Sequence, residues 1–253
     1  QVLDHMFFDG LQNPDDGLMM GVFGERCAEK FNFTREQQDA FSIASIERAL
    51  AAMEGQFAAE ISPVTVKSRR GESVITEDQE PPSCNIGKIP SLRAAFKKDG
   101  TVTAASSSKI SDGAAATVLM SAEKAAEMGL TPLATIVAHS TYSQDPEWFT
   151  TAPIGAIEKV LQRAGWSVGD VDLYEVNEAF ATVTMAAMHE LNIDHDKMNI
   201  NGGACALGHP IGASGARVVV TLINALRQRG LKKGVAALCI GGGEATALAI
   251  ELP

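Results

Sequence analysis

The chain has 253 residues, of which 45% are apolar and 6% aromatic, and it contains 23 glycines. This length can bury a core in one large domain or in two smaller ones, and the composition suits layered α/β structure better than a disulfide scaffold or a disordered tail. The formal net charge of −10 excludes a general binder of nucleic acid or of anionic membranes, because both need clustered positive charge.

In the first hundred residues, one helix has a clear start. Thr34 and Gln37 form a capping-box pattern, in which the hydroxyl and the side-chain amide bond the first backbone amides of a helix. The pattern predicts a helix that runs to about residue 52. Residues 63–85 are polar and proline-rich, so we expect loops and short strands there rather than core.

From residue 101 the pattern becomes more regular. Residues 101–104 are strand-like, a polar loop follows, and residues 114–120 form a short apolar run. Beyond residue 132, predicted strands alternate with predicted helices: strands 133–138, 171–176, 235–240 and 245–252, and helices 154–164, 178–191 and 218–229. Helices between short apolar strands predict a sheet that is covered on both faces.

The four cysteines are scattered, without the paired spacing of zinc ribbons or disulfide frameworks. Cys205 and His209 are four residues apart, but no second ligand pair accompanies them, so we expect no metal site. This cysteine usage predicts a reducing compartment, which we take to be the cytoplasm. The sequence has no apolar run long enough to span a bilayer and no signal-peptide core, so we expect no membrane partner. The chain opens at Gln1 in sequence that reads as folded, and we expect something to precede it.

Two glycine-rich stretches hold an imidazole and a thiol. His209 lies within residues 201–215, between glycines, and Cys239 stands near the end of an apolar strand, just before three glycines. A glycine-rich backbone lets a substrate come close and leaves N–H groups free to point at developing negative charge. Asn177 follows the predicted strand 171–176, at the kind of strand end where open α/β sheets place ligands. The pattern therefore indicates acyl-group chemistry.

Each of these three residues also has an ordinary explanation. A free cysteine is most often a small buried apolar residue, a lone loop histidine is usually only polar, and asparagine is a common helix N-cap. What favours a site is their convergence on successive strand ends.

Four segments resemble the C-terminal signatures of the thiolases, with the acetyl-CoA acetyltransferases as the nearest group: Asn177-Glu-Ala-Phe180, Asn201-Gly-Gly-Ala204, Gly208-His-Pro-Ile-Gly-Ala-Ser-Gly215 and Cys239-Ile-Gly-Gly-Gly243. The resemblance implies a thiolase-like layered α/β fold. Residues 1–120 would be an irregular loop domain together with the returning last strand of the N-terminal thiolase domain. Residues 121–253 would be the C-terminal domain, a mixed sheet covered by helices.

The resemblance implies Claisen condensation of two acetyl-CoA to acetoacetyl-CoA and CoA, or the reverse thiolysis. By motif position, His209 would activate the nucleophile and donate to the enolate oxygen, and Cys239 would handle the α-proton. Asn177 would hold the water that joins His209 in one oxyanion hole, and the Gly241 amide would serve the other. No cofactor is expected, because coenzyme A thioesters are the substrates.

The same resemblance assigns residues that contact the substrate. Ser108 matches the serine that touches the pantetheine, and Leu11 lies where the family contacts coenzyme A. Four further residues fall where the family lines the acyl and pantetheine tunnel: Met20, Phe96, Phe149 and Phe180. The expected partners are acetyl-CoA and acetoacetyl-CoA, with assembly into a homodimer or homotetramer.

One departure from the family is large. The nucleophilic cysteine of thiolases lies in their N-terminal domain, and nothing here matches it, since Cys27 falls in a predicted helix and Cys84 in a proline-rich loop. We therefore expect this chain alone to be inactive. A smaller departure is Lys109, which stands where a small residue is common. Two alternatives stay open: a degradative 3-ketoacyl-CoA thiolase of broader chain length, and a non-catalytic CoA-binding fragment.

Overall fold

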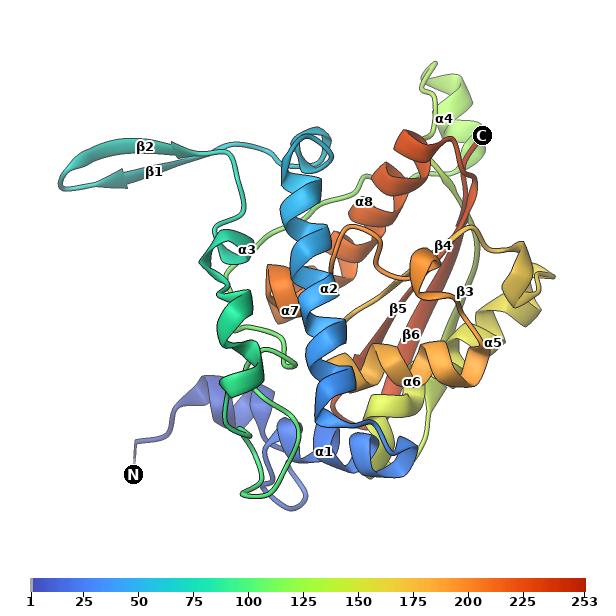
Figure 1. Cartoon of the computed structure of the whole chain (residues 1–253). Helices are drawn as coiled ribbons and strands as arrows, with labels where there is room; N and C mark the ends of the chain where they lie inside the picture. Colours follow the sequence, from blue (N-terminus) through green and yellow to red (C-terminus); the bar gives the residue numbers. More distant parts are fainter. Residues whose placement is uncertain (1) are drawn as a thin grey trace.

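The computed structural model describes residues 2–253 (Figure 1). Its first third is built around two helices, α1 (Met20–Phe31) and α2 (Arg35–Met53). The capping box that opens α2 is present as predicted, because the Thr34 hydroxyl accepts from the Gln37 backbone and the Gln37 side chain accepts from the Thr34 backbone. Along its length α2 packs against α6 (Ala181–Leu191) and α7 (Ala204–Leu207).

A two-stranded hairpin extends away from the body of the molecule (Figure 1). Its strands, β1 (Val64–Ser68) and β2 (Gly71–Ile75), pair antiparallel and are almost fully exposed. The short helix α3 (Glu80–Ser83) follows and returns the chain to α2. The prediction of loops and short strands is confirmed for residues 63–79, whereas residues 80–83 form the short helix α3.

The C-terminal half is organised by one four-stranded sheet, with strand order β3-β6-β5-β4. Its strands are β3 (Thr135–Ser143), β4 (Leu173–Val176), β5 (Lys233–Ile240) and β6 (Glu244–Glu251). The sheet is mixed, because β4 and β5 run parallel while β3–β6 and β5–β6 are antiparallel.

Helices cover both faces of this sheet. On one face α5 (Ala152–Ala164) and α6 pack over Val235 and Ala237, and on the other α8 (Ile211–Arg229) packs over Ala236. Alternate residues of one strand therefore enter two different cores, which is why residues 235–240 are apolar throughout. The predicted covered sheet is confirmed.

The remaining elements are short. The helix α4 (Ala122–Glu127) precedes β3. One π-helix and five 3-10 helices complete the described residues: Met6–Leu11, Phe57–Ala59, Ile86–Ser91, Pro146–Thr151, Val168–Asp170 and His195–Lys197. No helix within residues 2–253 has both the length and the apolar character needed to cross a membrane.

The predicted strand at residues 101–104 is wrong, because these residues make only an isolated bridge, Thr103 to Ala94. The apolar run 114–120 forms no strand within residues 2–253. The second segment is extended and exposed, with Val118 85% and Leu119 73% accessible. A strand needs a neighbour to accept and donate its ladder hydrogen bonds, and within residues 2–253 this segment has none.

Candidate active site

The site begins where two parallel strands end side by side. In the register of β4 and β5, Val176 pairs with Ala237, and the Asn177 backbone N–H donates to the Ala237 carbonyl at 2.9 Å. Cys239 lies two residues further along β5. The parallel pairing therefore brings Asn177 and Cys239 to the same edge of the sheet.

His209 reaches this edge from the loop that precedes α8. Its Nε2 lies 3.3 Å from the Asn177 Nδ2, and its Nδ1 lies 2.6 Å from the Ser214 Oγ. The Ser214 hydroxyl donates its one proton to the Pro210 carbonyl at 3.0 Å, so it accepts from Nδ1–H. This network assigns the tautomer that carries its proton on Nδ1 and leaves the Nε2 lone pair facing Asn177.

The imidazole of His209 is neutral at ordinary pH. Burial lowers its pKa to about 4, and the positive charge of Arg217 acts in the same direction. A neutral imidazole with a free Nε2 lone pair can accept a proton from a nearby acid. The structure therefore holds His209 in a form that suits a general base.

Cys239 is, after His209, the second titratable group at this edge of the sheet. Burial raises the pKa of its thiol to about 12, with a smaller increase from Cys27 and a backbone hydrogen bond acting against both. The thiol is therefore protonated at neutral pH, although the residue as a whole is only half-buried. The turn after it brings Gly241 under Met20, whose Cε would lie 2.8 Å from a Cβ at position 241. Any residue larger than glycine would push Met20 away.

A buried carboxylate holds the loop that leads to His209. Glu178 accepts hydrogen bonds from the Ser45 hydroxyl at 2.7 Å, the Asn199 amide at 2.9 Å and the Cys205 backbone at 3.0 Å. Its side chain is nearly inaccessible. These three donors satisfy the buried carboxyl group, so Glu178 fixes α2 and the glycine-rich loop to the end of β4.

The four residues assigned to the tunnel lie together. Phe149 and Phe180 belong to one buried apolar cluster, and Met20, Phe96 and Cys239 pack on it. The rings of Phe96 and Phe180 meet edge to face, with centroids 5.9 Å apart. The cluster gives the thiol an apolar surround, which is the physical cause of its raised pKa.

The two residues assigned to coenzyme A lie in different surroundings. The Ser108 backbone donates to the Ala179 carbonyl at 3.0 Å, which places Ser108 beside the Asn177-to-Phe180 segment. Leu11 ends the N-terminal π-helix and is half-buried outside the cluster that contains Phe180. The structure therefore joins Ser108 to the site by a backbone hydrogen bond, whereas Leu11 lies outside the site's apolar cluster.

Three residues that shape the site escaped the sequence reasoning. Ser214 sets the tautomer of His209, Arg217 lowers its pKa, and Asn199 bonds both backbone groups of Val176 at the end of β4. Ser214 could have been found, because it lies five residues after His209 in the same glycine-rich stretch. Arg217 and Asn199 carry no local signal of their roles.

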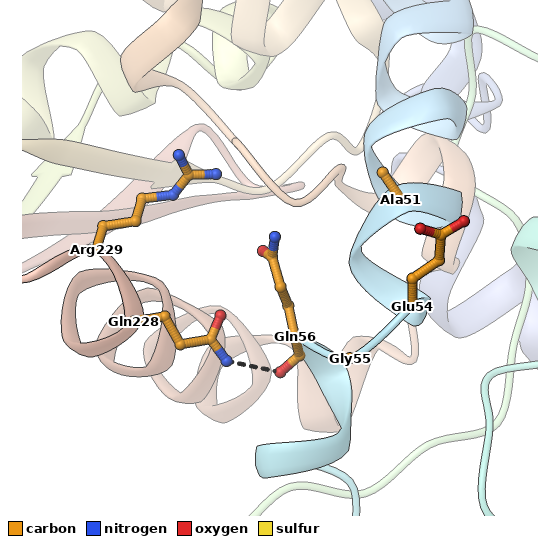
Figure 2. Close-up of a pocket in the computed structure, with 6 residues that line it drawn as sticks. All are labelled: Ala51, Glu54, Gly55, Gln56, Gln228 and Arg229. Carbon is orange, nitrogen blue, oxygen red and sulfur yellow. Dashed lines mark hydrogen bonds between the residues drawn. The ribbon is translucent and has the colours of Figure 1, made fainter.

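Two surface cavities lie outside this site, since neither is lined by Asn177, His209 or Cys239. One of about 570 Å³ lies between the end of α2 and the end of α8 and is lined mostly by polar and charged residues (Figure 2). There the Gln228 side-chain amide donates to the Gln56 carbonyl at 3.0 Å. Another of about 400 Å³ lies between residues 111–115 and the start of α8. Within residues 2–253, no group of three or more His, Cys, Asp or Glu side chains could hold a metal ion.

Comparison with protein families identifies the fold. A family profile described as "Thiolase, N-terminal domain" matches residues 1–123, and one described as "Thiolase, C-terminal domain" matches residues 130–252. The mixed sheet, its two helical layers and these matches define an α/β protein of the thiolase type.

Individual relatives agree with this class. The chain is 49% identical over 251 residues to a probable acetyl-CoA acetyltransferase of Dictyostelium discoideum, covering 98% of this chain and 61% of that protein. It is 48% identical over 256 residues to an acetyl-CoA acetyltransferase of Chromobacterium violaceum, covering 100% and 65%.

Solved structures agree as well. The acetyl-CoA acetyltransferase of Bacillus anthracis superposes with a TM-score of 0.95 at 45% identity, covering 100% of this chain and 66% of that one. The human mitochondrial 3-ketoacyl-CoA thiolase gives 0.93 at 35%, covering 100% and 64%. The chain thus spans 61–66% of the length of these four relatives.

The chain belongs to the thiolase family, and the predicted family and layered α/β fold are confirmed. The family uses no cofactor.

Proposed function

We propose that the protein containing this chain is an acetyl-CoA C-acetyltransferase, which condenses two acetyl-CoA to acetoacetyl-CoA and CoA or runs the reverse thiolysis. The observation that carries the proposal is the contact between Asn177 and His209 at the sheet edge where Cys239 also lies. The relatives named acetyl-CoA acetyltransferase support the substrate class.

In this proposal His209 acts twice. Its neutral Nε2 takes the proton of the nucleophilic thiol, and it later donates to the enolate oxygen of the second acetyl-CoA. Asn177 holds the water that completes this oxyanion hole. Support comes from its buried Oδ1, which has no hydrogen-bond partner within residues 2–253 and is therefore an acceptor for such a water.

Cys239 acts as the acid and base for the α-proton. Its apolar surround favours the thiol, so once deprotonated it is a strong base. The Gly241 backbone N–H serves the second oxyanion hole. Ser108 and Leu11 contact the coenzyme A portion, and the cluster around Phe180 lines the acyl tunnel.

The nucleophile is assigned to polypeptide outside these 253 residues. Cys27 is fully buried, and burial raises its pKa to about 11, so it cannot readily form the attacking thiolate. Cys205 is buried too and has a raised pKa. The 253-residue chain alone is therefore expected to be inactive. Residues 1–120 serve as the loop domain and residues 121–253 as the C-terminal domain of a cytoplasmic homodimer or homotetramer.

The experiment is a thiolysis assay of the full-length protein with acetoacetyl-CoA and CoA, with and without Cys239→Ala. Loss of the acid/base group is expected to lower kcat by roughly 10²–10⁴-fold. Val74→Ala, on the exposed hairpin, is the control and should stay within about twofold of wild type, as surface substitutions usually do. Equal turnover of the Cys239→Ala and Val74→Ala proteins would remove Cys239 from the mechanism.

A second candidate is a degradative thiolase of broader chain length. It is favoured by the similarity to a human mitochondrial 3-ketoacyl-CoA thiolase, at a lower identity than the acetyltransferases. Comparing kcat/KM on acetoacetyl-CoA and on a long 3-oxoacyl-CoA separates the two. A preference for the long chain would favour the degradative enzyme.

A further inference from the structure

One stripe of α1 faces the loop of residues 94–103. The stripe consists of three residues spaced four apart, which lie on the same side of a helix: Gly21, Glu25 and Glu29. Each meets a different part of the loop, in that order the ring of Phe96, the backbone of residues 101–102 and the side chain of Lys97. Three contacts along one helix therefore fix where this loop lies.

The contact through Glu25 is buried. Glu25 is only 3% exposed, and its carboxyl group accepts from the Val102 backbone N–H at 2.9 Å. It also accepts from the backbone N–H of Thr101 at 2.9 Å and from the Thr101 hydroxyl at 3.2 Å. Breaking such bonds inside the protein leaves buried polar groups without partners, which is costly. The backbone at residues 101–102 is therefore anchored on α1.

Two backbone contacts carry this anchor to Phe96. Thr103 forms an isolated bridge with Ala94. One residue earlier in the anchored arm, the Val102 carbonyl accepts from the Ala95 N–H at 2.9 Å. The other arm leads directly into Phe96, so the anchored arm restrains the arm that carries the ring.

Gly21 decides how close the Phe96 ring comes to α1. A Cβ at position 21 would overlap the ring, so the ring occupies the space that any side chain there would need. From this position the ring meets Phe180 edge to face and packs on the apolar cluster that Cys239 also contacts. Phe96 is half-buried, so it covers part of the cluster and stays partly exposed. The place of this ring therefore limits the room beside the cluster.

We propose that Gly21 and Glu25 are positioning residues that set acyl-chain selectivity, because they fix Phe96 over the apolar cluster that Cys239 contacts. The inference rests on the proposed function, in which this cluster lines the acyl tunnel. While the ring stays in place, an acyl chain longer than that of acetoacetyl-CoA meets it. When the ring moves away, the space it leaves accepts further methylenes, each of which changes kcat/KM by about 10–200-fold in an apolar pocket.

Chain-length selectivity of the full-length protein measures the role of Gly21. The measured quantity is the ratio of kcat/KM on 3-oxooctanoyl-CoA to kcat/KM on acetoacetyl-CoA in thiolysis. Gly21→Ala should raise this ratio by ~10-fold, because the added methyl group displaces the Phe96 ring. Phe96→Ala should raise it by a similar factor. Adding Gly21→Ala to Phe96→Ala should then change the ratio by less than about twofold, because both act through the same ring.

Two results of this cycle would overturn the proposal. One is a ratio that Gly21→Ala leaves unchanged. The other is a double variant in which Gly21→Ala raises the ratio as much as it does in the wild-type background, since Gly21 would then act without Phe96.

Glu25→Gln tests the anchor, and Glu29→Gln is the matched control on the same stripe. Glutamine keeps the size of the side chain, but its NH₂ group cannot accept from a backbone amide. Backbone hydrogen exchange in peptides that cover residues 101–103 should become ~10-fold faster in Glu25→Gln, and the selectivity ratio should rise by about threefold. Glu29 and Lys97 are exposed, so Glu29→Gln should change neither quantity by more than about twofold.

The two readouts separate the possible failures. Unchanged exchange in Glu25→Gln, or an equal effect of Glu29→Gln, would overturn the anchor. Faster exchange with an unchanged ratio would overturn the link to selectivity. A wild-type protein that cleaves neither substrate would remove the proposed function and the selectivity with it, whereas the exchange comparison would still decide whether Glu25 holds the loop.

Discussion

The chemistry of the site depends on how single residues are buried. His209 and Cys239 occupy the same sheet edge, and burial moves their pKa values in opposite directions, to about 4 and about 12. The imidazole is therefore an acceptor and the thiol a donor at the same pH. Desolvation always favours the neutral form, so a cation loses its proton and an acid keeps it.

The lowered pKa of His209 predicts how the protein responds to acid. In the full-length protein, the ¹³C resonances of the His209 ring should stay constant down to about pH 5 and shift near pH 4. Because the pKa is lower in the fold than the usual ~6.5, the unfolded chain binds the extra proton between these values. The associated stability, roughly 1–3 kcal/mol, is complete above pH 6.5 and is lost as the pH falls towards 4.

The control for this prediction is exposed His139. The free energy of unfolding of the His209→Gln protein should no longer fall between pH 6.5 and 4 on account of this histidine. The His139→Gln protein should keep that part of the pH dependence. Burial raises the pKa of Glu175 to about 8, so this residue makes the stability fall as the pH rises from 4.5, opposite to the effect of His209. The effect of His209 is therefore read from the difference between the two variants. A His209 resonance that titrates near pH 6.5 would contradict the burial of the ring.

At the scale of elements, the site depends on close packing between α2 and the glycine-rich loop. Gly202 has a φ of +78°, and a Cβ there would collide with the Ser45 carbonyl and lie 2.8 Å from the Ala49 Cβ. The approach of the loop to α2 lets the Ser45 hydroxyl reach Glu178 and lets the Gly203 backbone reach Ser45. A glycine is needed here for both its conformation and its size.

Gly202→Ala should therefore destabilise the protein by roughly 2–5 kcal/mol, as the sum of left-handed strain and overpacking. Gly230 is the matched control, because it has a φ of +64° but a Cβ added there would meet nothing within 4 Å. Gly230→Ala should cost only the strain, roughly 1–2 kcal/mol. Urea unfolding measures both, and equal losses would show that α2 does not restrict position 202.

Elements whose signals are local could be predicted from the sequence. The capping box of α2 and the apolar strand ending at Ile240 were recovered, because each is set by neighbouring residues. Starts of other helices were misplaced: α6 begins at Ala181 rather than 178, and α8 at Ile211 rather than 218. The first turn of α8 follows Pro210 and contains glycines, which have low helix propensity, so the sequence did not indicate a helix there. Packing of its buried residues stabilises this turn in the fold.

At the scale of the whole molecule, an apolar surface is left uncovered. Val118, Leu119 and Met120 are exposed in an extended segment, and the chain spans 61–66% of the length of its relatives. We propose that this segment belongs to the returning last strand of the N-terminal domain, which the resemblance places within residues 1–120. A strand that pairs only with residues outside these 253 would look extended and bare in this structure.

A pair of lysines tests this assignment. Val118→Lys with Leu119→Lys should change the stability of the 253-residue chain by less than about 0.5 kcal/mol and reduce its self-association. In the full-length protein the same change should cost about 3 kcal/mol or more, since burying each apolar side chain is worth about 1.5–3 kcal/mol. Met128→Lys, on an exposed residue of α4's C-terminal end, should be neutral in both. Equal stability of the double variant and wild type at full length would refute the strand assignment.

The sequence by itself determined the family, the layered fold and the residues to inspect, because glycine placement, apolar runs and motif spacing act over a few neighbouring positions. Only the tertiary structure decided which atoms meet. Asn177 and His209 are 32 positions apart and Cys84 and Lys109 are 25 apart, and each contact depends on how the chain folds back between them. Burial decided the protonation of the site for the same reason, since water is excluded by residues brought in from distant elements.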